Sequence, residues 1–298
     1  MRLFKSEKGN VAVIVSLVLT AILGMSGFVI DMGTAYVEKA NLANAIDAAL
    51  LAGAQELPTN KIKAKSIMET YLVENGVALE DVEISIAADG LRADINARKN
   101  VDFTFSKVLG IDNAEVDEDG GVILGTASSA RGGLRPFGVT KDDFTYGDLV
   151  VLKEGAGDGY HGNYGMIALG GNGASVLIYN MLYGYDGEVK VGDFIDTEPG
   201  NIASSVRALQ CYLSSYDEAF DDFERGSARV WTIPLFETME VNGREAIQVV
   251  GFAHFFVEDV YKRSGKAEVH GRFIEYVTSG EIDNSLEFTG TYAMKLVD

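Results

Sequence analysis

The chain has 298 residues, 47% of them hydrophobic, and a formal net charge of −19. This length accommodates one or two globular domains with sizeable cores. An acidic chain repels phosphates, so nucleic acid is not an expected partner. The single cysteine, Cys211, excludes a disulfide within the chain. We expect it to be a small buried residue on a helix, with a disulfide between chains as the alternative.

Residues 11–30 contain no charged side chain, and twelve of the twenty are Val, Ile, Leu or Phe. A helix of this length spans roughly 30 Å, the thickness of the hydrocarbon layer of a bilayer. The preceding residues 1–10 carry Arg2, Lys5 and Lys8, which predicts a cytoplasmic N-terminus and a chain that continues outside. An uncleaved anchor is favoured over a secretory signal, because the run exceeds the usual ~7–15 apolar residues of a signal and the helical pattern continues beyond it. A bundle of like helices is the alternative to lipid.

The helical pattern continues through residues 31–57, where apolar or small residues recur at three-four spacing. No proline interrupts residues 11–57, so we expect one continuous helix of roughly 70 Å, closed by Pro58. Its outer half is amphipathic and rich in alanine, which permits close approach of a neighbour.

One face of the apolar half carries a row of small residues spaced four apart. Such rows let helix backbones approach closely in an apolar medium, and the ordinary composition of membrane helices explains the row equally well. The predicted packing and assembly residues of the whole helix are Ala12, Ser16, Thr20, Gly24, Leu42, Ile46 and Leu50.

The next segment predicts a small helix-plus-sheet domain over residues 59–131. Residues 61–74 have helical spacing, and Asn75–Gly76 forms a stop. The period then changes to two, with a turn signal at residues 88–90. The predicted strands are 82–87, 91–97, 101–105 and 122–127.

Composition changes again near Arg131–Pro136, a glycine-containing segment that predicts a linker or boundary. A β-rich domain is expected over 132–298, with Pro234 marking an edge or bulged strand and Asn242-Gly243 a hairpin turn. Its predicted elements are strands at 148–153, 164–169, 174–179, 188–195, 229–236, 246–258, 267–278 and 286–296, and a helix over roughly 202–223. The predicted fold class is therefore α+β: a cytoplasmic tail at 1–10, a long helix at 11–58, a small domain at 59–131 and a β-rich domain at 132–298.

Catalytic signals are weak. The three histidines have no partner at i, i+4 and no Cys pair exists, so a zinc site is not expected. His254 is interpreted as a structural polar residue in a strand. Residues 157–162 match G-x-G-x-x-G, but a predicted strand follows instead of a helix, so a strand connection is favoured over a nucleotide site. No catalytic residue is predicted.

Two acidic segments, 117–120 and 142–143, are interpreted as solvated turns. Carboxylates in loops also bind calcium, which makes Asp117 and Asp119 weak calcium candidates, but the twelve-residue spacing of a specific calcium loop is missing. No other cofactor or metal is expected.

The segment 7–54 resembles the N-terminal region of TadE/TadG-like proteins of the tight-adherence (Flp-type) pilus system. Gly9-Asn10, Asp31-Met32-Gly33, Tyr36 and residues 44–54 carry the resemblance. Later stretches look like extracytoplasmic domains of the same family: 97–111, 162–171, 189–201 and 249–258.

The resemblance implies a pilin-like, envelope-anchored protein of pilus assembly, surface attachment or the filament itself. Two family features are not carried over. No D-x-S-x-S motif of a metal-dependent adhesion domain is present, and Ile14 stands where a type IV pilin counted from Gly9 has glutamate.

The leading hypothesis is a non-enzymatic cell-surface protein, either a pilus or filament subunit or a pilus-assembly factor. It would associate with itself through the N-terminal helix, with the membrane and with other pilus-assembly or envelope proteins. The alternative is a membrane-tethered hydrolase or carbohydrate-binding protein, for which a pocket with paired carboxylates beside the tyrosines would be evidence. Those tyrosines are Tyr160, Tyr164, Tyr179, Tyr183 and Tyr185.

Overall fold

The computed structural model describes residues 7–141, 145–154, 163–198, 205–239, 244–263 and 266–297. The chain divides into two compact units. The first unit contains the residues up to 53, residues 60–122 and the last residues from 296, and the second contains residues 54–59 and 123–295. The architecture is mixed α+β with a long apolar helix and a β-rich C-terminal region, as the sequence predicted.

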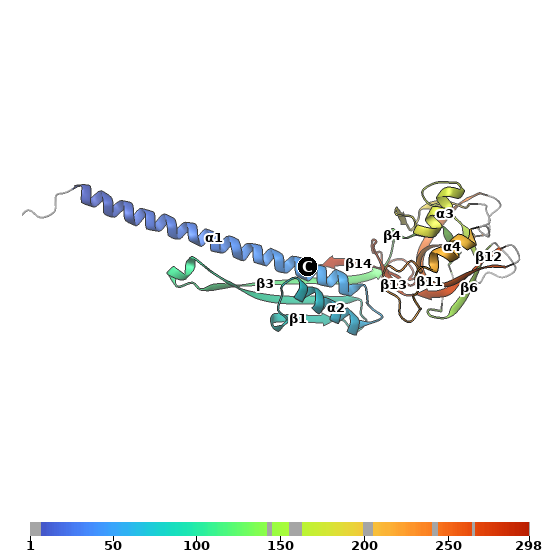
Figure 1. Ribbon diagram of the computed structural model, residues 1–298, viewed down its shortest axis with the longest axis horizontal. Coiled ribbons are helices and arrows are strands. Elements are labelled where there is room, and N and C mark those ends of the chain that lie inside the picture. Colours follow the sequence, from blue (N-terminus) through green and yellow to red (C-terminus); the bar gives the residue numbers. More distant parts are fainter. Residues whose placement is uncertain are drawn as a thin grey trace, which may run out of the picture. The chain divides into compact units, whose positions relative to one another are not determined.

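The first unit is built on helix α1 (Glu7–Ala54), which is continuous over 48 residues. Its first half extends past the strands, and its second half lies along them (Figure 1). Asn60 caps the start of helix α2 (Lys61–Glu74), because its side chain accepts the Lys63 N–H, and Gly76, at φ +77°, follows the C-cap Asn75. Both the long helix and the short one are confirmed.

Three strands cover the second half of α1: β1 (Val82–Ile86), β2 (Arg92–Asp102) and β3 (Asn113–Thr126). β1 and β2 form the predicted antiparallel hairpin. The separate strand predicted at 101–105 is wrong, because β2 continues to Asp102 and residues 103–105 lie in no strand. A short 3-10 helix, η2 (Ser106–Leu109), lies in the turn between β2 and β3. A second 3-10 helix, η1 (Leu79–Asp81), precedes β1.

The acidic segment 117–120 is not a turn but lies inside β3. A strand accommodates it because alternate side chains point to opposite faces, which separates neighbouring charges. Glu118 also forms an ion pair with Lys39 of α1 at 3.4 Å, which offsets part of the repulsion.

The second unit contains a closed ring of six strands in the order β10-β5-β7-β6-β12-β11, which closes because β10 also pairs with β11. Closure leaves no free edge in the ring. The core side chains include Trp231, Phe255 and Phe273, and Phe137 stacks on Trp231 at 4.7 Å between ring centroids. The ring strands are β5 (Phe137–Thr140), β6 (Leu149–Glu154), β7 (Asn163–Met166), β10 (Val230–Phe236), β11 (Ala246–Arg263) and β12 (Lys266–Ile274).

One shorter strand, β9 (Phe194–Asp196), extends this sheet by pairing with the start of β11. The strands β4 (Ser129–Arg131) and β8 (Glu188–Lys190) form a separate two-stranded sheet. β13 (Tyr276–Thr278) pairs in parallel with β14 (Thr291–Val297). Gly192, at φ +99°, separates β8 from β9 where one strand over 188–195 was predicted.

The predicted strand at 174–179 is wrong, because the segment is helix α3 (Ala174–Tyr183). A short apolar run is compatible with either structure. As a helix, the segment packs Leu177 and Met181 against the core. The helix predicted over roughly 202–223 is shorter in the described residues, where α4 spans Val206–Leu213. The hydroxyls of Ser214 and Ser215 donate to the Cys211 carbonyl and compete with further helical turns.

Cys211 lies on α4, as predicted, but it is exposed and not buried. The buried stripe of α4 is Val206, Leu209 and Leu213, and residue 211 points away from it. The expected irregularity at Pro234 is confirmed, because the register of β10 against β11 shifts just after it, between Leu235 and Phe236.

The segment expected to be a linker contributes to the second unit, where Leu134 and Arg135 are both buried. Three predicted features lie outside the described residues: the acidic pair at 142–143, the glycine motif at 157–162 and the turn at Asn242-Gly243.

Candidate functional site

The first half of α1 exposes an apolar surface. Leu17 and Val29 are 67% and 68% exposed, and the helix is long and apolar enough to cross a membrane. Its hydroxyls are satisfied internally: Ser16 Oγ donates to the Ala12 carbonyl and Thr20 Oγ1 to the Ser16 carbonyl, each at 2.8 Å. A hydrocarbon environment requires this internal pairing, because it offers no water to hydrogen-bond.

The small-residue row of this half meets no other part of the described chain. Ala12, Ser16, Thr20 and Gly24 are all exposed, and a Cβ built on Gly24 would have nothing within 4 Å. Assembly through this row stays a prediction.

The predicted stripe of the outer half is covered by the chain itself. Leu42, Ile46 and Leu50 are buried. A Cβ on Gly120 of β3 would lie 2.9 Å from Ile46 Cγ2, which shows how closely the strand approaches the helix. In a single chain these three residues therefore fix the strands to α1, and a role in contacts between copies stays a prediction.

The boundary between the two halves of α1 contains a specific seat for the β2–β3 turn. Asp31 is 3% exposed. Its Oδ1 accepts the N–H of Thr104 at 2.9 Å, and its Oδ2 accepts those of Phe105 and Ser106 at 3.0 and 2.5 Å. These amides open η2, where helical N–H groups lack partners and favour a negative charge.

Gly27, one helical turn before Asp31, completes this seat. A Cβ there would lie 2.6 Å from Phe105 Cβ, so the turn can approach only a glycine. We call Gly27 and Asp31, together with residues 104–106, the turn seat. The sequence indicated Asp31 as the charge at the end of the apolar run, but it gave no sign of a partner more than 70 residues away.

The far side of the seated turn exposes large apolar side chains. Phe105 is half-exposed and Val108 is 90% exposed, and Leu109 and Ile111 are also exposed. The turn seat therefore places a second apolar surface next to the end of the apolar half of α1.

Calcium binding at Asp117 and Asp119 stays a prediction. Asp117 and Asp119 are exposed on β3. No group of three or more His, Cys, Asp or Glu residues that could hold a metal ion occurs among the described residues.

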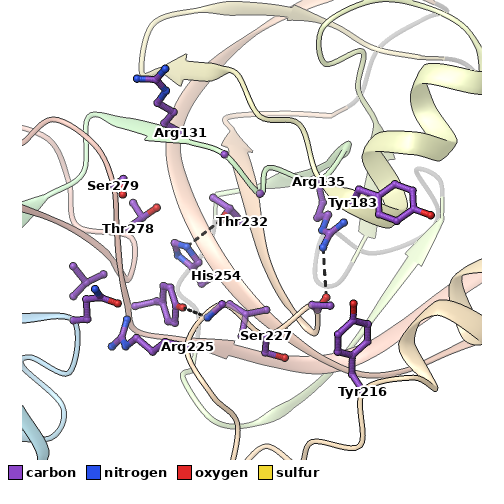
Figure 2. A pocket seen from close by; sticks show the side chains of 18 of the residues that line it. Arg131, Arg135, Tyr183, Tyr216, Arg225, Ser227, Thr232, His254, Thr278 and Ser279 are labelled. Carbon is purple, nitrogen blue, oxygen red and sulfur yellow. Dashed lines mark hydrogen bonds between the residues drawn. The ribbon is translucent and has the colours of Figure 1, made fainter. Parts of the chain in front are cut away.

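The second unit contains a pocket of about 560 Å³. Figure 2 shows Arg135 with Tyr183 and Tyr216 on one side, and Arg225 with His254 and Thr232 on the other. None of the described residues that line the pocket is an Asp or Glu. The paired carboxylates that would be evidence for a glycoside hydrolase are therefore not among them.

Arg135 is the most unusual group of this pocket. It is 4% exposed, and its Nη1 and Nη2 donate to the carbonyls of Met181 and Ala228 at 3.2 and 3.5 Å. Its Nε has no hydrogen-bond partner, and no ion pair with a described carboxylate is found. Burial lowers the pKa of Arg135 to about 10, partly opposed by Tyr212, so the side chain stays charged at neutral pH.

The positive charge of Arg225 is partly balanced by its neighbours. Its Nε lies 3.5 Å from Glu56 Oε1, and its guanidinium stacks 4.3 Å above the centroid of the Tyr276 ring. Its buried Nη1 has no hydrogen-bond partner. The pocket thus holds the buried guanidinium of Arg135 and the partly buried one of Arg225, and each contains a buried nitrogen without a hydrogen-bond partner.

His254 has the structural role that the sequence predicted. Its Nε2 and Nδ1 each lie 3.1 Å from a hydroxyl oxygen, of Thr232 and Thr291 respectively. Burial, with a smaller effect of Arg225, lowers the pKa of His254 to about 3, so the ring is neutral.

The pocket was not predicted, although one of its tyrosines, Tyr183, had been noted. Arg131 and Arg135 were read as parts of a linker, because their neighbours Gly132 and Gly133 are typical of turns. The sequence signal was weak: two arginines lie in one stretch of five residues in a chain that is otherwise acidic. This alone does not indicate a pocket.

The comparisons with known proteins bear on the N-terminal segment. Residues 9–56 match the family model described as "Tad: Putative Flp pilus-assembly TadE/G-like". Neither a curated protein nor a solved structure matches the chain. This match and the apolar helix fit a cell-surface protein related to pilus assembly, with a single membrane anchor. The N-terminal part of the chain, over residues 9–56, is therefore a TadE/G-like segment, the family that residues 7–54 resemble.

Proposed function

We propose that this chain is a non-enzymatic pilus-assembly factor held in the membrane by the first half of α1, with its N-terminus in the cytoplasm and both units outside. The observation that carries the proposal is the exposed, uncharged surface of residues 11–30 inside the TadE/G-like match. The basic residues before it support the orientation.

A membrane-held factor is preferred to a filament subunit because the outer stripe of α1 is already covered by the chain's own strands. The apolar half alone then remains for lipid or for neighbouring helices. The exposed small-residue row favours the filament subunit as the second candidate, since it would let α1 helices pack closely.

Mechanically, the turn seat explains how such an anchor would hold the first unit. Three backbone amides bound by one carboxylate fix the β2–β3 turn to α1 just beyond the apolar run. The seated turn adds exposed Val108 and Leu109 beside that boundary. We infer that this apolar surface lies against the membrane interface.

Cell fractionation tests the anchor. Leu19→Arg places a charge in the middle of the apolar run, which disfavours membrane insertion by about 2.5–3.5 kcal/mol. We expect this variant to lose much of its membrane fraction after alkaline washing. Val37→Arg, at an exposed position of the outer half, is the matched control and should stay with the membrane.

Shearing the cells separates the two candidates. A membrane-held factor stays in the membrane pellet, whereas a filament subunit appears in the sheared, sedimentable material. A wild-type chain that is a dispersed, detergent-free monomer would contradict both candidates.

A further inference from the structure

The pocket of the second unit has the properties of a binding site for a small anion. A buried charge without a counter-ion is costly, and a ligand that pairs with it gains a strong, charge-assisted hydrogen bond. Arg135 is in this situation, since its buried Nε lacks a partner.

The rest of the lining indicates what the anion would be attached to. Tyr183, Tyr212 and Tyr216 form a row in which successive ring centroids are 5.4 and 5.3 Å apart. All three line the pocket, as does Tyr276 on the Arg225 side. Tyrosines offer apolar ring faces and hydroxyl groups together, which suits a ring-shaped, hydroxylated ligand. The volume of about 560 Å³ falls within the range of small-molecule sites.

Charge also limits the ligand. Nη1 and Nη2 of Arg135 each donate to a backbone carbonyl, and the buried Nε has no hydrogen-bond partner. The single positive charge of Arg135 is balanced by the single negative charge of a carboxylate, whereas a phosphate presents more oxygens and more charge. The net charge of −19 repels anions at a distance, but screening over about 8 Å at physiological salt leaves recognition to these short-range contacts.

We propose that this pocket binds a sugar that carries a carboxylate, such as a uronic acid, with the carboxylate at Arg135 and the sugar ring against Tyr183, Tyr212 and Tyr216. The site would give the exposed unit a means of recognising acidic surface polysaccharides. This inference is independent of whether the chain is an assembly factor or a filament subunit.

Isothermal titration calorimetry of the full chain in detergent tests the proposal, with D-glucuronate, D-glucose and inorganic phosphate as separate ligands. We expect glucuronate to bind, and glucose and phosphate to bind at least about tenfold more weakly. A uronic acid trimer then distinguishes a polysaccharide from a free sugar as the ligand, because only the polysaccharide source predicts tighter binding of the trimer.

Two variants locate the site. Arg135→Gln should weaken glucuronate binding about tenfold or more by removing the charge. Arg263→Gln is the matched control, because its side chain is 66% exposed and outside the pocket lining, and it should bind as the wild type does. Tyr183→Ala alters a half-exposed ring and tests the site if Arg135→Gln fails to fold. We expect it to lower the affinity for glucuronate several-fold.

The proposal is overturned if the wild type binds no glucuronate, or if glucose or phosphate binds as tightly. Unchanged affinity in both pocket variants would also overturn it.

Discussion

At the scale of single residues, burial determines how the polar groups of the second unit behave. His254 is kept neutral because its surroundings disfavour charge, while two threonine hydroxyls satisfy its nitrogens. Arg135 stays charged in a similar setting. Burial lowers its pKa only to about 10, because the ordinary pKa of a guanidinium is very high, and the group is therefore protonated at neutral pH.

His254 makes the free energy of unfolding of the second unit depend on pH. Its pKa is about 3 in the folded chain and ~6.5 when unfolded, so unfolding takes up a proton between these values. The stabilisation is fully present above the unfolded pKa and declines by about 1.4 kcal/mol per pH unit as the pH falls toward the folded pKa. Between pH 7 and pH 5 we expect a loss of about 2 kcal/mol from this residue.

Urea unfolding followed by the fluorescence of Trp231 measures this effect, because the only tryptophan of the chain is buried in the same unit. His254→Gln should remove most of the pH dependence between pH 7 and pH 5. An unchanged dependence in this variant would show that other groups are responsible.

At the scale of elements, α1 is one helix with two separate roles. The small-residue row of its apolar half meets no other part of the described chain, and its outer half carries the strands of the first unit. Gly24 and Gly27 lie less than one turn apart but differ in their surroundings. Gly24 faces open space, and Gly27 faces Phe105.

This difference makes the two glycines a matched pair. Gly27→Val should push the β2–β3 turn off the helix, because a Cβ would lie 2.6 Å from Phe105 Cβ. Hydrogen exchange should then accelerate at the amides of residues 104–106, and Asp31→Ala should produce the same change. Gly24→Val should leave these amides protected.

Equal exchange in both glycine variants would contradict the turn seat. Because Gly24 belongs to the small-residue row, its valine variant also tests assembly. If copies pack through this row, cross-linking within the membrane should decrease in Gly24→Val and not in Gly27→Val.

At the scale of the whole molecule, both units follow one proposed membrane anchor in a chain whose net charge is −19. The proposed orientation places both units outside, where no disulfide within the chain stabilises them and the six ring strands of the second unit leave no free edge among themselves.

The single cysteine reports this orientation directly. Cys211 is exposed on α4, so a membrane-impermeant thiol reagent should label it in intact spheroplasts. Cys211→Ser, which should not be labelled, is the control for other reactive groups. Labelling only after permeabilisation would show that the second unit faces the cytoplasm.

The sequence by itself determined the local features of this protein. The uncharged run 11–30, the absence of proline up to 57 and the switch to a period of two from Val82 depend on neighbouring residues, so α1, α2 and the first hairpin could be predicted. Short apolar segments such as 174–179 could not be assigned, because helix and strand differ there only in their tertiary packing.

Only the tertiary structure decided the two sites. The turn seat joins Asp31 to amides 73–75 residues away, and the pocket gathers Arg135, Arg225 and His254 from distant segments. Both sites depend on contacts between residues that are far apart in the sequence, and the spacing of residues along the chain does not indicate such contacts. The chain's need for an apolar environment can therefore be predicted from its residues, whereas the lining of the pocket was decided by which distant side chains folding buries together.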